Sequence, residues 1–372
     1  MAEFKFKPGA VRNSPRRKPV CHALAGFKRR IPLMNSAAND LTLTLLIPGA
    51  RGEVSDDASY VAAASAPELD LLLSRAQPAP VDAEFEQLVC RLFGVTLPPD
   101  ADVPIAPLTY ALDHGAPPAG YCMRVDPVHV VADRDVLRML DPHTLAITPV
   151  EARDMVATLN AHFAQDGLQF IAPHPERWYL DLPTDPRLRT HPLARTIGAS
   201  LHDFLPFGER GKHWQGVLNE IQMLLHEHPM NNAREARGAL PINSVWFWGG
   251  GRLPALAPKI WAQVWSDEVA ALGLAKLSQV PRSNAPESAV AWLREAITPG
   301  DHLLVLPAVT RAALAGMNVA WFAPLYAALK SRRLQRLTLH LANGVAYQVD
   351  AAALKRWWIR PRPLAQFLSA LV

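Results

Sequence analysis

The chain has 372 residues, of which 49% are hydrophobic and 19% are charged, as in a globular protein with a substantial core. Its three cysteines form no CxxC pair, which argues against a disulfide framework and against a thiolate zinc site. No apolar run reaches the roughly 18 residues that a membrane helix needs. We therefore expect a soluble, cytoplasmic protein without membrane contact, built as one large domain or two.

The net charge of +4 is unevenly distributed along the chain. Residues 1–33 hold nine Lys or Arg and one Glu, and residues 330–372 hold eight Lys or Arg and one Asp, so residues 34–329 carry a net charge of −11. Such asymmetry is typical of contact with nucleic acid or an anionic surface. Residues 1–33 lack the apolar core of a secretory signal, and we interpret them as a basic disordered tail or the product of a start codon placed too early.

The first half of the chain alternates short helical and strand-like patterns. Predicted helices lie at 66–76, 82–94 and 148–167, and predicted strands at 41–47, 121–133, 168–173 and 177–183. The first strand ends at Pro48-Gly49, and a proline-rich connection occupies 96–107. In the third helix, Thr148 and Glu151 have the spacing of a capping box, and Gly167 marks the end.

The second half contains a helix at 214–228, a short helical turn at 231–238 and an apolar strand at 241–248 suited to burial on both faces. Beyond residue 256, strands and helices alternate. Predicted strands lie at 275–281, 302–308, 334–341 and 345–350, and predicted helices at 285–297 and 321–332. This alternation predicts an α/β fold with a mostly parallel sheet flanked by helices.

The segment 226–254, "HEHPMNNAREARGALPINSVWFWGGGRLP", concentrates the residues best suited to bind a ligand. Its triple glycine follows a strand and could form an anion-binding nest or a sharp turn, but no GxGxxG or Walker pattern is present. His226 and His228 are two residues apart, whereas the HExxH pattern places its histidines one helical turn apart, so the spacing disfavours a metal site. Arg234 and Arg237, three residues apart, can face one way and bind a phosphate or carboxylate, or form a solvated face.

Two further patterns carry possible chemistry. Asp301-His302 is a pair that metal-dependent phosphoryl-transfer enzymes use, but it precedes a strand, whereas α/β sites lie after strands. Asp113-His114 stands alone in a predicted loop. The basic stretches 330–336 and 355–363 interleave arginines with tryptophans, which suits stacking on nucleic-acid bases or a terminal helix that packs its tryptophans and leaves its arginines in water.

The segment 218–251 resembles the metal-binding and insert region of the archaeal-type, cofactor-independent phosphoglycerate mutases. That region runs L-N, a helix, H-P-x-N-x-x-R-x-x-x-G-x-x-P-x-N, a strand and a glycine-rich turn. The matching positions are Leu218, Asn219, His228, Pro229, Asn231, Arg234, Gly238, Pro241, Asn243 and Gly249 to Gly251. From about residue 40 the chain also resembles a bacterial group of RpfE-type regulatory proteins, in the stretches "ADRDVLRMLDP" and "LNAHFAQDGLQFIAPHPERWYLDLP".

The resemblance implies an alkaline-phosphatase-like fold, two divalent metal ions held by Asp and His, and a Ser nucleophile. The catalytic pattern departs from this. Pro48 stands where the mutases carry an aspartate after the first strand, and neither an Asp-Ser turn nor a late Asp-x-x-x-His pair is found.

We therefore expect a reduced alkaline-phosphatase-like α/β core at 34–115 and 251–372, with an inserted α+β subdomain at 116–250. We expect a regulatory or small-anion-binding protein that lacks metal-dependent mutase chemistry and holds a phosphorylated or carboxylate metabolite, with no metal site. The expected ligand-binding residues are Asn219, His228, Asn231, Arg234, Arg237, Asn243, Gly249, Gly250 and Gly251.

Two alternatives stay open, as does the oligomeric state. In the first, the chain is an active Mn- or Mg-dependent mutase whose ligands come from Asp113, His114, Asp301 and His302. In the second, which the patterns favour less, the basic ends bind nucleic acid.

Overall fold

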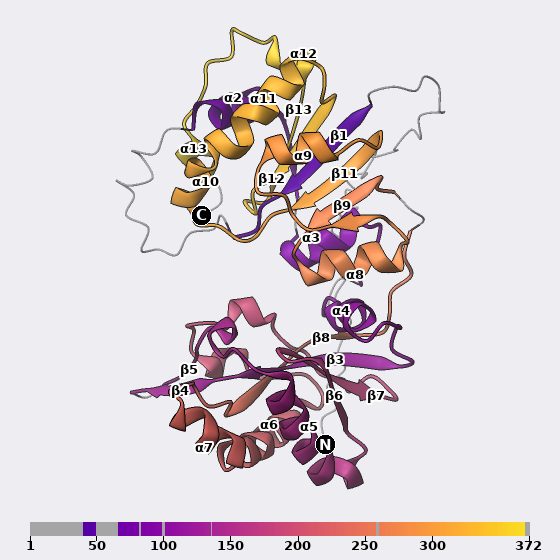
Figure 1. Ribbon diagram of the computed structural model, residues 1–372, viewed down its shortest axis with the longest axis vertical. Coiled ribbons are helices and arrows are strands. Elements are labelled where there is room, and N and C mark those ends of the chain that lie inside the picture. The colour runs from indigo at the N-terminus through magenta and orange to yellow at the C-terminus, as the bar shows by residue number, and fades with distance from the viewer. Residues whose placement is uncertain are drawn as a thin grey trace, which may run out of the picture. The chain divides into compact units, whose positions relative to one another are not determined.

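The computed structural model describes residues 40–49, 66–81, 83–98, 101–134, 136–257 and 260–368, and these form the three sheets shown in Figure 1. The predicted tail at 1–33 lies outside these residues. Within them, no helix is both long and apolar enough to cross a membrane.

The largest sheet has seven strands in the order β10-β9-β11-β1-β12-β13-β2. The bounds are β1 (Leu41–Leu46), β2 (Gln77–Pro80), β9 (Gln263–Ser266), β10 (Arg282–Ser283), β11 (Gly300–Val305), β12 (Arg336–His340) and β13 (Val345–Asp350). The strands from β10 to β12 run parallel, and β13 and β2 add antiparallel pairs at one edge. The predicted mostly parallel α/β sheet is thereby confirmed. The pattern missed β2, whose Pro78 and Pro80 are tolerated because it is an edge strand.

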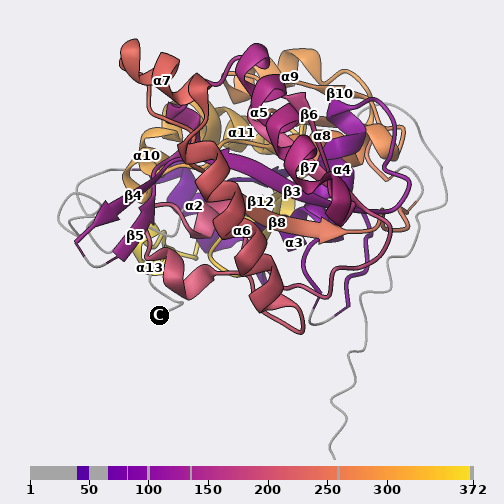
Figure 2. The same ribbon diagram turned by 90° about the horizontal axis from the view of Figure 1, so that it is seen from below.

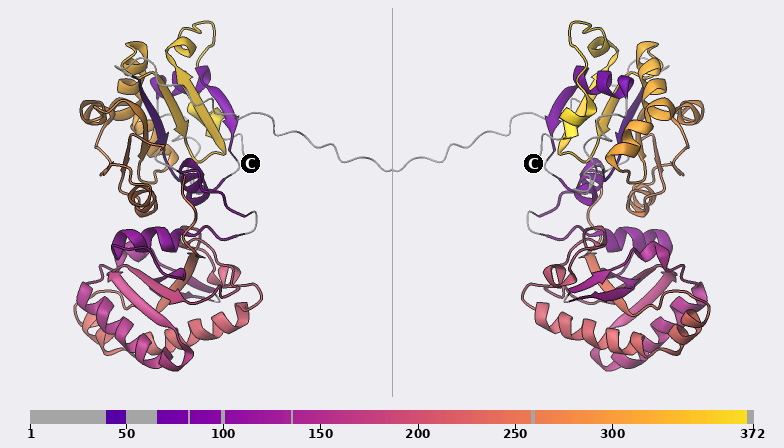
Figure 3. Two further views of the ribbon diagram at one scale, coloured as in Figure 1. Left: turned by 90° about the vertical axis from the view of Figure 1, so that its right-hand side faces the viewer. Right: turned by 90° about the vertical axis from the view of Figure 1, so that its left-hand side faces the viewer.

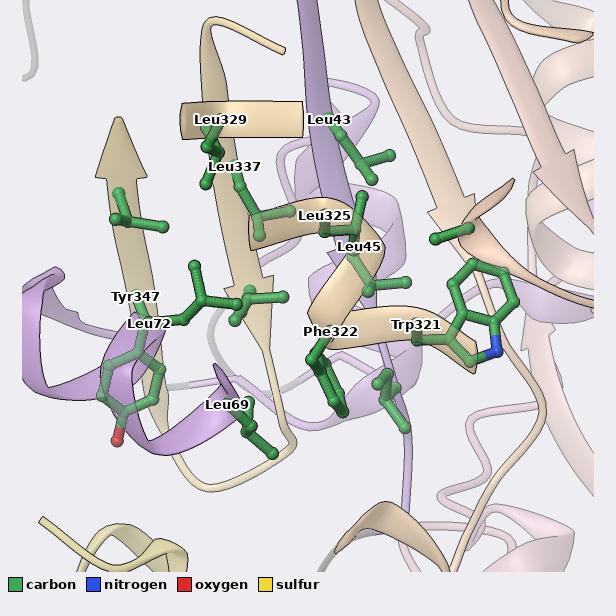
Figure 4. Close-up of a cluster of buried hydrophobic side chains, with 14 of the residues drawn as sticks. Leu43, Leu45, Leu69, Leu72, Trp321, Phe322, Leu325, Leu329, Leu337 and Tyr347 are labelled. Carbon is green, nitrogen blue, oxygen red and sulfur yellow. The ribbon is translucent and has the colours of Figure 1, made fainter. Parts of the chain in front are cut away.

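Helices flank this sheet on both faces, as Figure 3 shows from two sides. They are α2 (Pro67–Arg75), α3 (Phe85–Leu92), α8 (Val269–Leu277), α9 (Ala289–Glu295), α10 (Arg311–Gly316), the π-helix η5 (Asn318–Phe322), α11 (Ala323–Lys330), α12 (Ala351–Leu354) and α13 (Leu364–Leu368). Consecutive residues of β1 point to opposite faces. Leu45 packs into the cluster with α2 and α11 drawn in Figure 4, and Leu46 packs into the cluster with α3 and α8. Each face of the sheet therefore has its own apolar layer.

A second sheet is antiparallel, in the order β6-β7-β3-β8. Its strands are β3 (Tyr121–Val128), β6 (Gln169–His174), β7 (Arg177–Leu182) and β8 (Ser244–Gly251), beside the hairpin of β4 (Val130–Asp133) and β5 (Val136–Met139). Its helices are α4 (Ile105–Asp113), α5 (Pro149–His162), α6 (Gly211–His226) and α7 (Pro229–Ala236), with 3-10 turns η1 (Pro142–Thr144), η2 (Phe163–Asp166), η3 (Leu193–Arg195) and η4 (Leu201–Phe204).

The two faces of this second sheet differ in chemistry. Met123 and Val125 of β3 lie in one apolar cluster with residues of α5 and α6, which lie across the sheet in Figure 2. Cys122, Arg124 and Asp126 alternate with them and face the other side, where α4 contacts β3 and β8. This face therefore carries the charged side chains of the strand.

The predicted helix start at Thr148 is confirmed as a capping box. The Thr148 hydroxyl accepts from the Glu151 amide at 3.3 Å, and the Glu151 carboxylate accepts from the Thr148 amide at 2.8 Å. Gly167 ends the following turn with φ +69°, a left-handed conformation that glycine adopts without strain.

The strand predicted at 275–281 is wrong. Helix α8 occupies 269–277 instead, and the strand of this region is β9, which the pattern missed. A short apolar run does not distinguish strand from helix, and the stretch "VAALGLAKL" is rich in alanine and leucine, which favour helix. Likewise, Asp113 is the last residue of α4, which begins inside the predicted proline-rich connection, and does not lie in a loop.

The glycine-rich turn expected at 249–251 is also wrong, because β8 continues through Gly251. Gly249, with φ +62°, lies where the β3–β8 register shifts, so its left-handed backbone belongs to a bulge. A Cβ at Gly250 would lie 2.5 Å from the Tyr121 hydroxyl, and one at Gly251 would lie 2.5 Å from the Pro104 Cβ. The two later glycines therefore serve close packing.

Candidate functional site

The two arginines of the predicted anion site are bound within the fold. The Arg234 side chain is fully buried and donates to the Leu240 carbonyl at 2.7 Å, the Glu151 carboxylate at 2.9 Å and the Leu145 carbonyl at 2.5 Å. Arg237 donates to the same carboxylate at 2.5 Å. Burial alone would raise the pKa of Glu151, but its hydrogen bonds outweigh burial and lower the pKa to about 2. Glu151 and Arg234 thus connect α5 to α7.

The asparagines and the histidine of the predicted anion site also form hydrogen bonds within the protein. Asn231 donates to the Leu225 and Ile242 carbonyls at 2.6 and 2.9 Å and accepts from the Ile242 amide at 2.8 Å. Asn243 exchanges two 2.8 Å bonds with the Val130 backbone. His228 caps α7, with Nδ1 accepting from the Met230 amide at 3.2 Å and Nε2 bonded to the Thr158 hydroxyl at 3.0 Å.

Anion binding by this group stays a prediction, while the hydrogen bonds show that its members connect α7, β8 and the β4–β5 hairpin. Asn219 lies apart from the group, exposed on α6 at a cavity of about 310 Å³ that Trp246 and Gln222 also line.

The residues of the alternative metal site do not come together. Asp113 accepts from Arg177 at 2.7 and 2.8 Å and from the Tyr179 hydroxyl at 2.6 Å, bonds that hold its pKa below the usual range although burial opposes them. Asp301 accepts from Thr42 at the amino end of β11. Among the residues that the structure describes, no three His, Cys, Asp or Glu side chains gather as a metal site requires. The ligand set proposed in this alternative is therefore wrong.

His302, the remaining late candidate, is a core histidine. Its Nδ1 accepts from the Trp265 indole at 3.1 Å and its Nε2 bonds to the Thr298 carbonyl at 2.8 Å, which fixes a neutral ring. Burial lowers its pKa, in agreement with that neutral form. His114 follows the last residue of α4, and its ring lies 4.8 Å from the Tyr110 ring at an interplanar angle of 38°.

In parallel α/β sheets, ligands bind beyond the carboxyl ends of the strands. At the centre of this edge, β1 continues into Ile47 and Pro48, and β11 continues into Leu306 and Pro307. A Cβ at Gly49 would lie 3.0 Å from the Cβ of Ala308, so the two segments pack against each other directly. Polar side chains lie instead at the β9–β10 side, where Asn284 donates to Asp267 at 2.8 Å.

A buried charge cluster on the α4 face of the second sheet was missed by the sequence patterns. Arg124, which is 5% exposed, donates to both carboxylate oxygens of Asp126 at 2.8 Å and lies over the rings of Tyr179 and Trp248 at 5.4 and 5.2 Å. The Trp248 indole also donates to Asp126 at 2.6 Å. The signal was present, since two opposite charges two residues apart on a strand share one face. Because Asp126 neutralises it, this arginine attracts no anion.

A larger cavity, of about 680 Å³, joins part of the predicted motif to residues that are distant in sequence. Gly250 and Gly251 line it beside Tyr121, and its charged lining residues are Asp102, Asp185, Arg187, Arg189, Glu209 and Arg252. Arg187 pairs with Glu209 at 2.7 Å, and Arg189 lies 3.9 Å from Asp102. Burial raises the pKa of Asp102 despite its bonds from Thr190. Arg252 donates to the Pro183 carbonyl at 3.2 Å, and the described residues give it no carboxylate partner.

Comparison with known proteins relates the chain to one group of enzymes. No protein-family model matches it. It is 28% identical over 146 residues to a probable 2,3-bisphosphoglycerate-independent phosphoglycerate mutase of Geobacter sulfurreducens, covering 37% of this chain and 35% of that protein. It is 29% identical over 114 residues to the 2,3-bisphosphoglycerate-independent phosphoglycerate mutase of Methanosarcina barkeri, covering 30% and 29%. These matches span about a third of the relatives' length.

Two solved structures align with a larger share of the chain. The PH0037 protein of Pyrococcus horikoshii is 11% identical with a TM-score of 0.51, covering 84% of this chain and 88% of that one, a likeness of fold. A cofactor-independent phosphoglycerate mutase of Thermoplasma acidophilum is 15% identical with a TM-score of 0.46, covering 88% and 95%. By sequence, the chain is related at low identity to the cofactor-independent phosphoglycerate mutases.

Proposed function

We propose that this protein is a relative of the phosphoglycerate mutases that acts in regulation by binding a small phosphorylated or carboxylate metabolite, without metal-dependent mutase chemistry. The relation to RpfE-type regulatory proteins belongs to the same proposal. Its ligand site is the 680 Å³ cavity beside Gly250 and Gly251, and that cavity is the observation on which the proposal rests.

The carboxyl edge of the large sheet supports the loss of mutase chemistry. Phosphoryl transfer through two metal ions needs anionic oxygen or imidazole ligands that stabilise both the attacking and the leaving oxygen. The segments that follow β1 and β11 instead present Pro48 and Pro307, and the Val309 amide donates to the Pro48 carbonyl at 3.2 Å. These two central strand ends are therefore filled by packed, hydrogen-bonded backbone.

The first test is a direct assay of the purified full-length chain. With Mn²⁺ or Mg²⁺ present, we expect no interconversion of 3- and 2-phosphoglycerate, measured by coupling the product to enolase. Turnover that follows the protein through gel filtration and is abolished by a chelator would contradict the loss of mutase chemistry. The assay covers the whole chain, including residues 50–65, which lie outside the described residues.

The cavity suits a small anion because Arg252 and Arg189 line it, and Arg189 forms only a long ion pair with Asp102, at 3.9 Å. Charge-assisted hydrogen bonds from guanidinium groups are among the stronger contacts for phosphate and carboxylate. Arg189 lies too far from Asp102 for a hydrogen bond, and its side chain is 42% exposed. Gly250 and Gly251 contribute to the cavity wall together with Tyr121 and Pro104, which pack directly against them.

The second test measures thermal stability with 3-phosphoglycerate, inorganic phosphate or glycerate added separately. A ligand that binds only the folded state stabilises it by about 2.7 kcal/mol at a hundredfold excess over Kd. We expect one of these anions to raise Tm, and we expect Arg252→Gln and Arg189→Gln to remove the shift.

Arg138→Gln is the matched control, since Arg138 is equally exposed, pairs with Asp133 and lies outside the cavity. A Tm shift that survives both cavity substitutions would place the ligand elsewhere, and no shift with any of the three anions would overturn the anion proposal.

A further inference from the structure

The loop 355–363, "KRWWIRPRP", connects α12 to α13 and exposes two adjacent tryptophans. Trp357 is 81% exposed and Trp358 is 65% exposed, and their rings lie 6.1 Å apart at an interplanar angle of 82°. The sequence-based alternative of a terminal helix that packs both tryptophans is therefore wrong. Large apolar side chains that cluster in water mark a surface that meets a partner.

Both ends of this loop are fixed to α2. Arg75 donates to the Leu354 carbonyl at 2.7 Å before the loop, and the Arg362 amide donates to the Ser74 hydroxyl at 2.8 Å at its far end. Beyond it, Leu364 and Phe367 are buried in the core of the large sheet. In Figures 1 and 3 the yellow segment between α12 and α13 runs at the outside of these helices. The tryptophans are thus presented by an anchored segment, so little ordering entropy opposes binding.

The loop carries charge of one sign only. Its basic residues are Lys355, Arg356, Arg360 and Arg362, and it contains no acidic residue. All four are exposed, and none forms an ion pair with a residue that the structure describes. Arg362 lies 4.9 Å over the Phe367 ring. A partner of complementary charge is therefore anionic.

We infer that this Trp-Trp loop docks on an anionic lipid surface as a peripheral membrane contact. Indole rings favour the boundary between headgroups and acyl chains, because one part of the ring is apolar and the N–H stays wet. Basic residues on both sides of the pair would lie at headgroup depth, where each contributes about 1 kcal/mol. The expectation of no membrane contact came from the lack of a long apolar run, and a peripheral contact needs no such run.

The ring geometry favours a lipid surface over single-stranded nucleic acid. Successive bases of a strand stack in parallel, and a protein platform offers them aromatic faces to match. Two neighbouring rings at 82° cannot both lie parallel to one base stack. An interfacial contact sets no such requirement, since each indole only has to reach the boundary layer.

The test is co-sedimentation of the full-length chain with vesicles of phosphatidylcholine alone or mixed equally with phosphatidylglycerol, at low salt. We expect binding to the mixed vesicles only. Trp357→Ala/Trp358→Ala should weaken it by about tenfold or more, because the inserted indoles are lost. Lys355→Gln/Arg360→Gln should weaken it on the order of 30-fold, the equivalent of about 1 kcal/mol per charge. Since these side chains are exposed, Tm should stay unchanged in both variants.

Val319→Ala is the matched control, because Val319 is also 81% exposed but lies outside the loop, and it should bind as the wild type does. Every variant keeps the basic residues 1–33, so a difference in binding between variants cannot come from that stretch. Wild-type chain that fails to sediment with the mixed vesicles would overturn the inference, and so would the Trp double variant sedimenting as the wild type does. The partner would instead be a nucleic acid if the wild type bound a thymidine oligonucleotide but no vesicles, and if both double variants lost that binding.

Discussion

Replacing Arg234 by methionine should lower the free energy of unfolding by about 3–5 kcal/mol, the usual cost of breaking a buried ion pair by removing one partner. Methionine fills much of the volume of the arginine stem, so the loss is mainly one of hydrogen bonds. The substitution removes one bond from Glu151 and leaves the carbonyls of Leu240 and Leu145 without this donor. Urea unfolding at pH 7, followed by circular dichroism, measures the change.

The control for this variant is Arg237→Met. Arg237 binds the same carboxylate, but its side chain is 48% exposed, so water can replace it and the loss should stay at about 1 kcal/mol or less. Equal losses in the two variants would contradict the structural role given to Arg234. If phosphate raises the Tm of the wild type but not that of Arg234→Met, and the variant is as stable as the wild type, Arg234 would be a ligand-binding residue.

Wild type and Arg234→Met should differ in free energy of unfolding by an amount that depends on pH, because Glu151 titrates. Its folded pKa is lowered to about 2, so its contribution to stability is complete above the unfolded value near 4.5 and is lost as pH falls through the folded value. Arg234 supplies part of that lowering. The stability difference between wild type and variant should therefore be constant near neutral pH and shrink between pH 4.5 and 2.

The sequence predicted four of the seven strands of the large sheet, because these four are short apolar runs separated by clear breaks, and it missed β2, β9 and β10. β1, β11, β12 and β13 all fall within or overlap predicted ranges. In α8 the error arose because a short apolar run is compatible with both a strand and a helix. Gly250 and Gly251 show the same ambiguity. Glycine allows a turn, but it equally allows a strand to approach Tyr121 and Pro104 within a distance that any Cβ would prevent.

The candidate site was less predictable, because spacing along a helix does not report what covers it. The three-residue spacing of Arg234 and Arg237 allows both to face a ligand, yet both bind Glu151, which lies 83 residues before Arg234. The other donors of Arg234 go to the carbonyls of Leu240 and Leu145. The cavity could not be predicted from the sequence, because the residues that line it are far apart along the chain. Asp102, Arg189 and Arg252 stand in separate connections, and only the folded chain brings them around Gly250. Of the residues predicted to bind a ligand, Gly250 and Gly251 line this cavity, and anion binding by the others stays a prediction.

The buried charge cluster of the second sheet makes the second strong prediction. Replacing Arg124 by methionine should lower the free energy of unfolding by about 3–5 kcal/mol, because Asp126 is 1% exposed and would keep only the Trp248 indole as a partner. Burial already raises the pKa of the Asp126 carboxyl, and without Arg124 the largest opposing influence is lost, so the pKa should rise further. A raised folded pKa gives stability below the unfolded value and loses it as pH rises, so the deficit of this variant should be smaller at pH 4 than at pH 7.

A second substitution separates the charge from the contact. Arg124→Met/Asp126→Asn removes both charges and leaves an amide oxygen in place of the carboxylate as an acceptor for Trp248. The double variant should therefore recover much of the stability lost in the single variant, with no pH dependence of its own. Arg138→Met serves as the exposed comparison, since its pair with Asp133 is solvated on both sides and should contribute about 0.2–1 kcal/mol. If the double variant is as unstable as Arg124→Met, the packing of the guanidinium on Tyr179 and Trp248 outweighs its charge, and the cluster is held by its rings.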